Sequence, residues 1–553
     1  MKKKLLSLLL ALMMLLPLAL AACSQDDNTE KDPDGDGSGT EQPSDGLYPS
    51  NPNFDTLSGF ESSDPTSWGE AKAHDPSVIE ADGVFYVFST DNEGTYGYQV
   101  RKSEDLIHWE WVGNAIEDCG TASTASSLYA GGNGGLQQVY NVISQDSNWS
   151  TKGAGKNEGP TWTLWAPDVV KGSDGKFWLY GCWTADFGQG HSVIFLCKAD
   201  KVTGPYTYDS MLLYSYDGWP TNNNNPNAID PQIYYVGEKM YMAYGSFTGG
   251  TWTIELDPET GRRADGLSGD DLLPAGGKSA SERYGTRLVN GTVTEGPTIN
   301  YHEDVAIYPT DLDSIKNYDA SKLTYEDRYY LMGSADSLSA NYNMRSFVGT
   351  VTDGTLSFTS YNGDSGNRVS GSFSWRTRSG DRGLSFDFFA PGHNDMITTS
   401  EGKNLIVYHN RKSFGSGEHY LFVSTYAFNS RGDLVMNPNR YAGETLRKVE
   451  ESELAGKEFY YVLVNSNEYS QLANGGYAQK GFVLGADNKV MLDGEEAGEW
   501  YLYGDNYVYI ELNDVAYYGV AMPAYIQKNK AGGISVSLLS ENGKDTLFMN
   551  VAA

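Results

Sequence analysis

The sequence has few cysteines and few basic residues, and each shortage excludes a class of function. It contains 4 cysteines in 553 residues, and the spacing of Cys23, Cys119, Cys182 and Cys197 matches no metal-binding knot. Lysine and arginine number 40 against 72 aspartate and glutamate residues, which gives a formal net charge of −32. Because so acidic a surface repels phosphate backbones, we expect no nucleic acid among the partners.

The three cysteines after Cys23 are odd in number, so at least one of them stays a free thiol. Cys182 and Cys197 lie in neighbouring strand-like runs. They fit either core positions or a single disulfide formed outside the cytoplasm.

A long apolar run occurs only at the N-terminus, where Leu5–Leu20 follows the basic residues Lys2–Lys4. This order is typical of a signal peptide, which we place at residues 1–22, and the run is short for a membrane span. The segment Leu20-Ala21-Ala22-Cys23 resembles a bacterial lipobox, which implies cleavage before Cys23 and lipidation of its thiol; an ordinary signal peptide is the alternative. We therefore expect a lipid-anchored, surface-exposed protein of the bacterial cell envelope, which meets the membrane only through this anchor.

Helical periodicity is also missing after the N-terminus, whereas 39 tyrosines and 63 glycines favour strands and turns. Residues 23–46 are polar and rich in Asp, Gly and Ser, and we predict a disordered linker there. From residue 47 to 447, hydrophobic runs alternate with turn signals such as Ala81-Asp82-Gly83. Residues 448–553 keep this alternation, and we predict a separate small β-barrel or sandwich.

One short pattern recurs five times between residues 74 and 396, and it predicts the architecture. The copies read HDPSVI, APDVV, IDPQI, EGPTI and PGHNDM, and each is followed by a turn and an aromatic-rich run. Four-stranded units that repeat in this way are typical of a β-propeller. We therefore predict an all-β chain with a five-bladed propeller over residues 47–447; a β-sandwich with recurring turns is the alternative.

Three of the copies carry a carboxylate, at Asp75, Asp230 and Glu295. A radial repeat brings the same part of every copy to one axis, so we expect these side chains to meet. Hydrolysis of a glycosidic bond needs a carboxylate and a carboxylic acid on either side of it. A neighbouring carboxylate helps to keep the acid protonated. The alternative is that each Asp-Pro pair merely begins a turn.

These segments resemble the signature segments of glycoside hydrolase family 43, and within it most closely those of the endo-1,5-α-L-arabinanases. The resemblance spans residues 70–440, and the last hundred residues resemble the C-terminal β-domain of larger members. It implies that Asp75 is the general base, Glu295 the general acid, and Asp230 the residue that tunes and orients the acid. Because the family inverts the anomeric configuration, Asp75 and Glu295 should lie roughly 6.5–9.5 Å apart.

Further site residues follow from the same resemblance. It implies that His393 reaches a calcium ion through one nitrogen and waters, although calcium prefers oxygen ligands; a hydrogen-bonded core histidine is the alternative. Because the tuning role falls to Asp230, we assign Asp168 to the structure or the wall of the site. His74 is expected to be structural or to contact substrate.

Aromatic side chains that stack on sugar rings are expected near the carboxylates. Trp165 and Phe247 are the main candidates, and Trp162 and Trp252 are weaker ones. Arg345 resembles a residue near the substrate in the family, with a surface ion pair as the alternative.

The resemblance implies an endo-acting enzyme that cuts α-1,5-linked arabinan, or a related pectic or hemicellulosic polysaccharide, as a monomer. Two alternatives stay open. One is an exo-acting α-L-arabinofuranosidase or β-xylosidase of the same family, and the other is a non-catalytic glycan-binding lipoprotein.

Overall fold

Antiparallel strands make up most of the computed structural model, and short helices lie between them. The structure describes residues 72–90, 97–116, 136–143, 164–184, 191–215, 225–247, 249–289, 294–338, 340–352, 354–377, 386–411, 418–467 and 478–552. All of these residues belong to one compact unit, Asp45–Ala553. The predicted signal peptide, Cys23, the linker, Cys119 and Trp162 lie outside the described residues.

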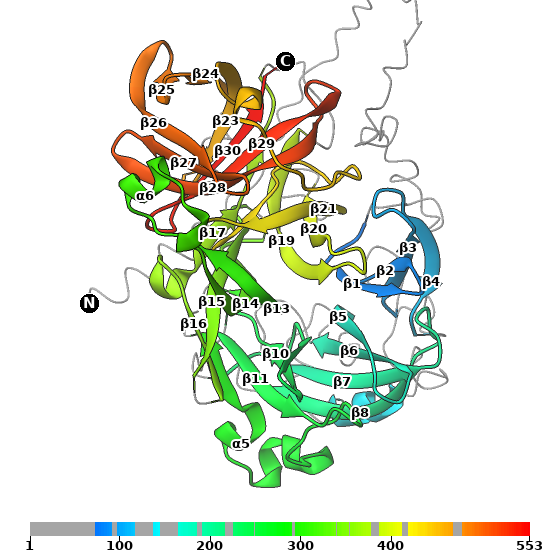
Figure 1. The fold of residues 1–553 in the computed structure, drawn as a ribbon. Helices are drawn as coiled ribbons and strands as arrows, with labels where there is room; N and C mark the ends of the chain where they lie inside the picture. Colours follow the sequence, from blue (N-terminus) through cyan, green and yellow to red (C-terminus); the bar gives the residue numbers. More distant parts are fainter. Residues whose placement is uncertain are drawn as a thin grey trace, which may run out of the picture. The chain divides into compact units, whose positions relative to one another are not determined.

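Five antiparallel sheets, which we call blades I to V, follow one another along the chain, as the colours in Figure 1 show. Blade I contains β1 (Ser77–Ala81), β2 (Val84–Ser89), β3 (Gln99–Ser103) and β4 (Glu110–Asn114). Blade II contains β5 (Leu164–Lys171), β6 (Phe177–Thr184), β7 (Ser192–Ala199) and β8 (Thr207–Ser215). Blade III contains β9 (Gln232–Val236), β10 (Lys239–Tyr244), β11 (Thr251–Leu256) and β12 (Thr286–Val289).

Blades IV and V each contain a fifth, short strand. Blade IV contains β13 (Glu295–Ile307), β14 (Thr324–Ala335), β15 (Asn343–Thr352), β16 (Thr355–Thr359) and β17 (Asn367–Ser370). Blade V contains β18 (Phe373–Ser374), β19 (Asp387–Thr398), β20 (Asn404–Arg411), β21 (His419–Phe428) and β22 (Leu434–Met436). The helices are α3 (Gln137–Ile143), α5 (Ala280–Tyr284) and α6 (Leu312–Lys316), with 3₁₀ turns η2 (Gly269–Leu272), η3 (Pro274–Gly276), η4 (Ala320–Lys322), η5 (Gly363–Ser365) and η6 (Glu451–Glu453).

The strand that begins with each sequence repeat is an inner strand of a ring. β1 contacts β5, β5 contacts β9, β9 contacts β13, β13 contacts β19, and β19 contacts β1 again. A separate apolar cluster fills the space between each pair of neighbouring blades. These contacts confirm the predicted five-bladed propeller.

Local sequence explains the strands and their turns. Asp82 and Gly83 have φ values of 54° and 75°, so they form a two-residue turn with both residues left-handed, and Ala81 pairs directly with Val84. The second strands are buried along most of their length because neighbouring blades cover both faces, and every residue of β6 is buried. Aromatic and β-branched residues therefore dominate these strands.

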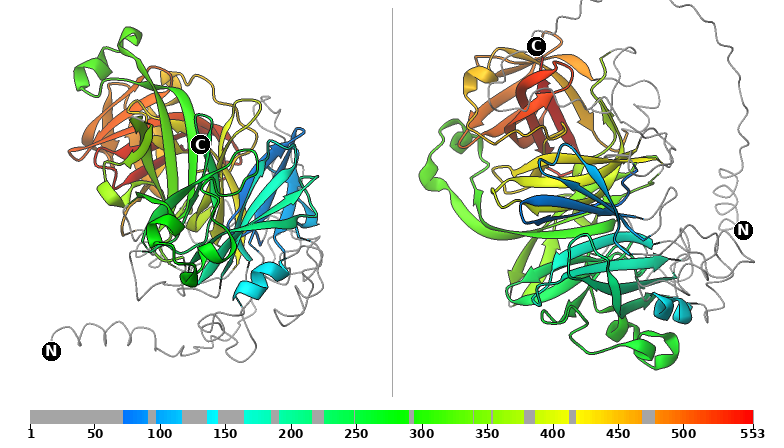
Figure 2. Two further views of the ribbon diagram at one scale, coloured as in Figure 1. Left: turned by 90° about the horizontal axis from the view of Figure 1, so that it is seen from below. Right: turned by 90° about the vertical axis from the view of Figure 1, so that its right-hand side faces the viewer.

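The C-terminal strands close into an eight-stranded barrel, drawn in orange to red in Figure 2. They are β23 (Lys457–Val464), β24 (Gln479–Leu484), β25 (Lys489–Leu492), β26 (Glu495–Tyr503), β27 (Tyr507–Leu512), β28 (Val515–Ile526), β29 (Ala531–Ser540) and β30 (Thr546–Val551). Large apolar side chains that include Phe459, Phe482 and Trp500 pack together as one buried cluster of the barrel. The barrel therefore has a hydrophobic core of its own.

Hydrogen bonds from the barrel reach the propeller. The side-chain amides of Asn439 and Asn550 bond each other reciprocally at 2.9 and 3.0 Å. The hydroxyl of Thr546 donates to the carbonyl of Arg368 at 2.6 Å. Apolar side chains of both parts, such as Phe373 and Phe548, share one cluster. This interface explains why the barrel and the propeller fall into one compact unit.

Cys182 and Cys197 are buried free thiols. Cys182 packs in the cluster between blades II and III, whereas Cys197 packs in the cluster between blades I and II. The two residues therefore occupy core positions and form no disulfide with each other. Within the described ranges, none of the helices has the length and apolar composition that crossing a bilayer requires.

The interface between the barrel and the propeller predicts how much one buried amide contributes to the stability of the protein. Replacing Asn439 with Ala leaves the buried amide of Asn550, which is 2% exposed, without its partner, so we expect a loss of about 1–3 kcal/mol in unfolding free energy. Denaturant unfolding followed by circular dichroism measures this loss. The exposed Asn317→Ala serves as the control and should cost less than about 0.5 kcal/mol. Equal losses in the two variants would contradict the role of the amide pair.

Candidate active site

Five residues with left-handed backbone lie within or just before the inner strands. Asp75, Ala166, Asp230, Gly296 and His393 have φ values of 53°, 40°, 56°, 55° and 44°. We call their places the head positions. Such values are uncommon for residues other than glycine, and their recurrence in all five blades indicates a built feature.

Irregular pairing accompanies the head positions in three blades. The register between the inner strand and the strand that follows it shifts between Trp165 and Asp168 in blade II, and between Glu295 and Thr298 in blade IV. In blade V it shifts between Gly392 and Asp395. A bulge of this kind turns side chains away from the regular alternation of the strand. The head positions of blades IV and V lie close together. A Cβ atom added to Gly296 would be only 2.9 Å from the imidazole ring of His393.

Side chains that can form hydrogen bonds surround the carboxylate of Asp75. The Thr90 hydroxyl donates to its Oδ2 at 2.6 Å. Its Oδ1 lies 3.0 Å from Nδ1 of His393, 3.2 Å from Nε2 of His74 and 3.4 Å from Nδ1 of His409. Only 9% of the side chain is exposed. The structure therefore places His74 and His393, both predicted site residues, directly against the predicted base.

The predicted acid, Glu295, lies one residue before a head position. The Ser246 hydroxyl donates to its Oε2 at 2.8 Å, and the Tyr342 hydroxyl donates to its Oε1. Burial and the nearby Asp230 carboxylate raise the pKa of Glu295 to about 7, and the two hydroxyls and His393 oppose that rise. A glutamic acid with such a pKa is about half protonated at pH 7, so it can both hold and release a proton there.

Asp230 links the other two carboxylates. Its Oδ2 accepts a hydrogen bond from the backbone N–H of Gly296, the residue next to Glu295, at 3.0 Å. Burial and the charge of Asp75 raise the pKa of Asp230 well above its usual range. The structure thus brings Asp75, Asp230 and Glu295 into one electrostatically coupled group, as the sequence predicted that they would meet.

Asp168 lies two residues beyond a head position and belongs to a different layer. Its Oδ1 accepts from the Ser77 hydroxyl at 3.0 Å, and its Oδ2 accepts from the backbone N–H of Ile233 at 2.7 Å. Burial and the charge of Asp395 raise the pKa of Asp168 to about 7. The equivalent head position of blade II is Ala166. These contacts tie Asp168 to blades I and III, and its assignment to the structure or the wall of the site stays a prediction.

The predicted aromatic walls differ in their surroundings. Trp165 is half-buried immediately before Ala166, and Phe247 is half-buried immediately after Ser246, which bonds the predicted acid. Trp252 lies further along β11, where its indole N–H donates to the carbonyl of Gly249 and the Arg287 guanidinium lies over its ring. Trp165 is therefore next to a head position and Phe247 is next to a residue that contacts the predicted acid. The contacts given for Trp252 are with residues of its own blade and the turn before it.

Arg345 is buried, with 7% exposure, although the sequence offered a surface ion pair as the alternative. Its guanidinium lies 3.8 Å from Asp336 and bonds the side chain of Asn343. Tyr342, in the same sequence segment, contacts the predicted acid.

Sequence reasoning missed several groups that contact the carboxylates. Thr90, Ser246, Tyr342 and His409 each touch Asp75 or Glu295. Tyr342 and Ser246 stand beside residues that were selected, but tyrosine and serine are common in strands and turns and gave no separate signal. His409 lies within the apolar run LIVYHNR, whose pattern indicates only a buried strand.

Comparison with known proteins identifies both parts of the chain. Residues 134–310 match the family model described as glycosyl hydrolases family 43, and residues 438–548 match a C-terminal lipocalin-like domain. The chain is 29% identical over 404 residues to the extracellular endo-α-(1→5)-L-arabinanase of Thermotoga petrophila, which covers 70% of this chain and 75% of that protein. It is 26% identical over 499 residues to extracellular endo-α-(1→5)-L-arabinanase 2 of Bacillus subtilis, over 86% of this chain and 92% of that protein.

Solved structures show the same arrangement. The crystal structure of the endo-1,5-α-L-arabinanase from Thermotoga petrophila RKU-1 aligns with a TM-score of 0.64 at 25% identity, over 87% of this chain and 99% of that chain. A family 43 glycoside hydrolase from Bacillus licheniformis aligns with a TM-score of 0.63 at 24% identity, which shows a shared fold.

Proposed function

We propose that this chain, a member of glycosyl hydrolases family 43 and hence a glycoside hydrolase, cleaves internal α-1,5-L-arabinofuranosyl linkages of arabinan with inversion, as a monomer. The observation that carries the proposal is the group formed by Asp75, Asp230 and Glu295. It contains one carboxyl whose pKa is raised to about 7 and one carboxylate held by donors on both oxygens. The names of the two relatives supply the linkage and the endo mode of attack.

In the proposed mechanism Glu295 gives its proton to the leaving oxygen of the glycosidic bond. Burial and the Asp230 charge keep that proton on Glu295 near neutral pH. When Glu295 is protonated, one of its oxygens becomes a donor, and Ser246 can then accept rather than donate. After the transfer, the Ser246 and Tyr342 hydroxyls stabilise the carboxylate that is left behind.

Asp75 acts as the general base on the opposite side of the bond. Thr90 fixes its Oδ2 and the surrounding imidazoles lie around its Oδ1, so the carboxylate is oriented before a water arrives. It takes one proton from that water as the oxygen attacks the anomeric carbon. A single displacement then inverts the configuration at this carbon. Asp230 positions the acid through the Gly296 N–H.

We also propose that a calcium ion lies on the propeller axis, held by His393 and waters. The head positions of blades II and IV carry the small residues Ala166 and Gly296, while Asp75 adds negative charge beside His393. These surroundings fit a hard dication whose other ligands are water oxygens. When bound, the ion supplies a positive charge that stabilises ionised carboxylates.

The N-terminal residues support a location outside the cytoplasm. Both relatives are named extracellular enzymes, and residues 1–22 read as a signal peptide. We propose that the protein is exported and anchored through a lipid on Cys23. Export would bring it to polysaccharide too large to enter a cell.

Removing either proposed catalytic carboxyl should nearly abolish hydrolysis. Glu295→Gln removes the transferable proton and Asp75→Asn removes the base, so kcat on linear arabinan should fall at least about a thousandfold in each. Glu303→Gln, an exposed residue on the same strand as Glu295, is the matched control and should keep wild-type kcat. Early oligomeric products from the wild type support endo cleavage. Monomer alone would contradict it, and turnover by either catalytic variant would overturn the assignment.

The pH profile should respond to Tyr342. Because the Tyr342 hydroxyl lowers the pKa of Glu295, Tyr342→Phe should raise that pKa. The alkaline limb of kcat/KM, above which the acid has lost its proton, should then move upward by about half to one pH unit. Tyr408→Phe, which removes a buried hydroxyl that bonds Ser424, should leave the limb in place. A limb that stays or moves downward in Tyr342→Phe would contradict the proposed acid.

Chelation tests the calcium proposal. Treatment with EGTA should lower the melting temperature by at least about 2 °C and reduce activity, because a ligand bound only to the folded state stabilises it. Added calcium should restore both quantities, and His393→Ala should show no response to either treatment. Unchanged melting and activity after chelation of the wild type would remove calcium from the model of the site.

A further inference from the structure

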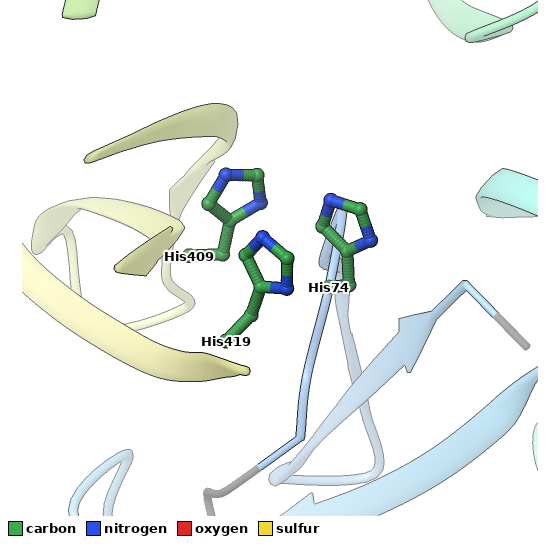
Figure 3. A group of neighbouring side chains, drawn as sticks. All are labelled: His74, His409 and His419. Atoms are coloured by element: carbon green, nitrogen blue, oxygen red, sulfur yellow. The ribbon is translucent and has the colours of Figure 1, made fainter. Parts of the chain in front are cut away.

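Histidine is scarce in this chain but concentrated beside Asp75. The sequence has 7 histidines, and three of them, His74, His409 and His419, offer ring nitrogens that all lie within 4.8 Å of one another. Figure 3 shows the three side chains coming from two parts of the fold, His74 from the start of blade I and the others from blade V. His409 and His419 belong to the neighbouring strands β20 and β21.

The three rings are buried and closely packed. Their exposed fractions are 9%, 0% and 3% in the same order. His74 and His419 stack with ring centroids 3.8 Å apart, and His409 lies 4.8 and 4.7 Å from them. Burial also lowers the pKa of His74 and of His409 well below the usual range. Neutral imidazoles are the form in which histidine binds metal ions.

The hydrogen bonding of His409 leaves one buried atom unexplained. The backbone N–H of Asp75 donates to Nδ1 of His409 at 3.3 Å, so the ring proton belongs on Nε2. No described residue forms a hydrogen bond with that Nε2 atom. A buried polar atom in this state destabilises the folded protein, and such atoms call for an explanation.

We propose that His74, His409 and His419 form a binding site for a borderline transition-metal ion such as Zn²⁺, distinct from the calcium proposed at His393. Imidazole nitrogens are preferred ligands of zinc, nickel and copper, whereas calcium prefers oxygen. When Nε2 of His409 binds the ion, the ring proton moves to Nδ1, where it faces Oδ1 of Asp75 at 3.4 Å in place of the bond from the Asp75 N–H, and the unexplained atom gains a partner.

Metal binding requires the rings to move. In the tetrahedral geometry of zinc, nitrogens bound at about 2.0–2.1 Å lie about 3.4 Å apart. The widest separation in the cluster, 4.8 Å, must therefore shorten by roughly 1.4 Å. Because the rings of His74 and His419 are nearly parallel, with an interplanar angle of 9°, one of them must also turn about its Cβ–Cγ bond to direct a nitrogen at the shared ion, and this torsion is soft.

Occupation of the site should slow hydrolysis, a consequence that rests on the proposed role of Asp75 as base. Its Oδ1 lies 3.2 Å from Nε2 of His74 and 3.4 Å from Nδ1 of His409. An ion held by these rings attracts that oxygen and competes for the electron pair that would take a proton from water. The cluster thus makes the enzyme sensitive to inhibition by zinc.

Metal titration of the full chain tests the site without reference to activity. The protein is freed of divalent ions with a chelator and titrated with ZnCl₂ by calorimetry, and with CoCl₂ by visible absorption. One equivalent should bind, and excess calcium should not displace it. His419→Phe keeps an aromatic ring against His74 and removes both ring nitrogens, so it should weaken binding at least roughly 100-fold. His419→Gln is the second variant if Phe disturbs folding, which circular dichroism reports.

The control is His108→Gln, which removes an exposed histidine whose side chain is 72% exposed and should bind zinc as the wild type does. Absence of zinc binding by the wild type, or equal affinity in the wild type and the folded His419 variants, would overturn the site. If arabinan is hydrolysed, zinc should inhibit the wild type more strongly than His419→Phe. Equal inhibition would overturn the link to Asp75, while failure to hydrolyse arabinan leaves the calorimetric test intact.

Discussion

Two buried carboxylates, Asp168 and Asp395, tie the inner strands of the propeller into a ring. Asp395 accepts hydrogen bonds from the backbone of Val78 in blade I and from Thr298 in blade IV. Asp168 reaches blades I and III in the same way. Among the described strands, none from one end of the propeller enters the sheet at the other end, so side-chain bonds and apolar packing close the ring between blades V and I. The cost of burying these charges is offset by the backbone and hydroxyl donors that surround them.

The catalytic group depends on this closure because its members come from separate blades. Asp75 stands two residues before Ser77, which bonds Asp168, and Glu295 stands three before Thr298, which bonds Asp395. The layer that fixes the ring therefore also fixes the spacing between base and acid. Left-handed heads then turn short side chains toward one another, so that Asp75 raises the pKa of Asp230 and Asp230 raises the pKa of Glu295. Architecture and acid–base chemistry are two results of one repeated segment.

Much of this could be predicted from the sequence, because the repeat carries both the fold and the carboxylates. The runs FWLYGCW and LIVYHNR became β6 and β20, since their apolar character reflects burial between blades. The repeat did not show that Asp168 and Asp230 occupy different layers. Asp230 precedes its proline and is itself the left-handed residue, whereas Asp168 follows its proline and lies beyond the left-handed Ala166 and the bulge of blade II. Tyr342 and His409 were missed because each contacts its carboxylate across 47 and 334 residues of sequence, a distance over which local patterns give no information.

The bond between Thr546 of the barrel and Arg368 of blade IV spans 178 residues. A ribosome that has just finished blade IV must therefore add the whole of blade V and nearly all of the barrel before this contact can form. During that interval the faces that later meet the barrel, including the amide of Asn439, face water or other proteins. Blades I to III can pack against each other while synthesis continues, whereas the second half of the molecule folds late and as one unit. Nascent chains should thus be most prone to misassembly in the interval between blade IV and β30.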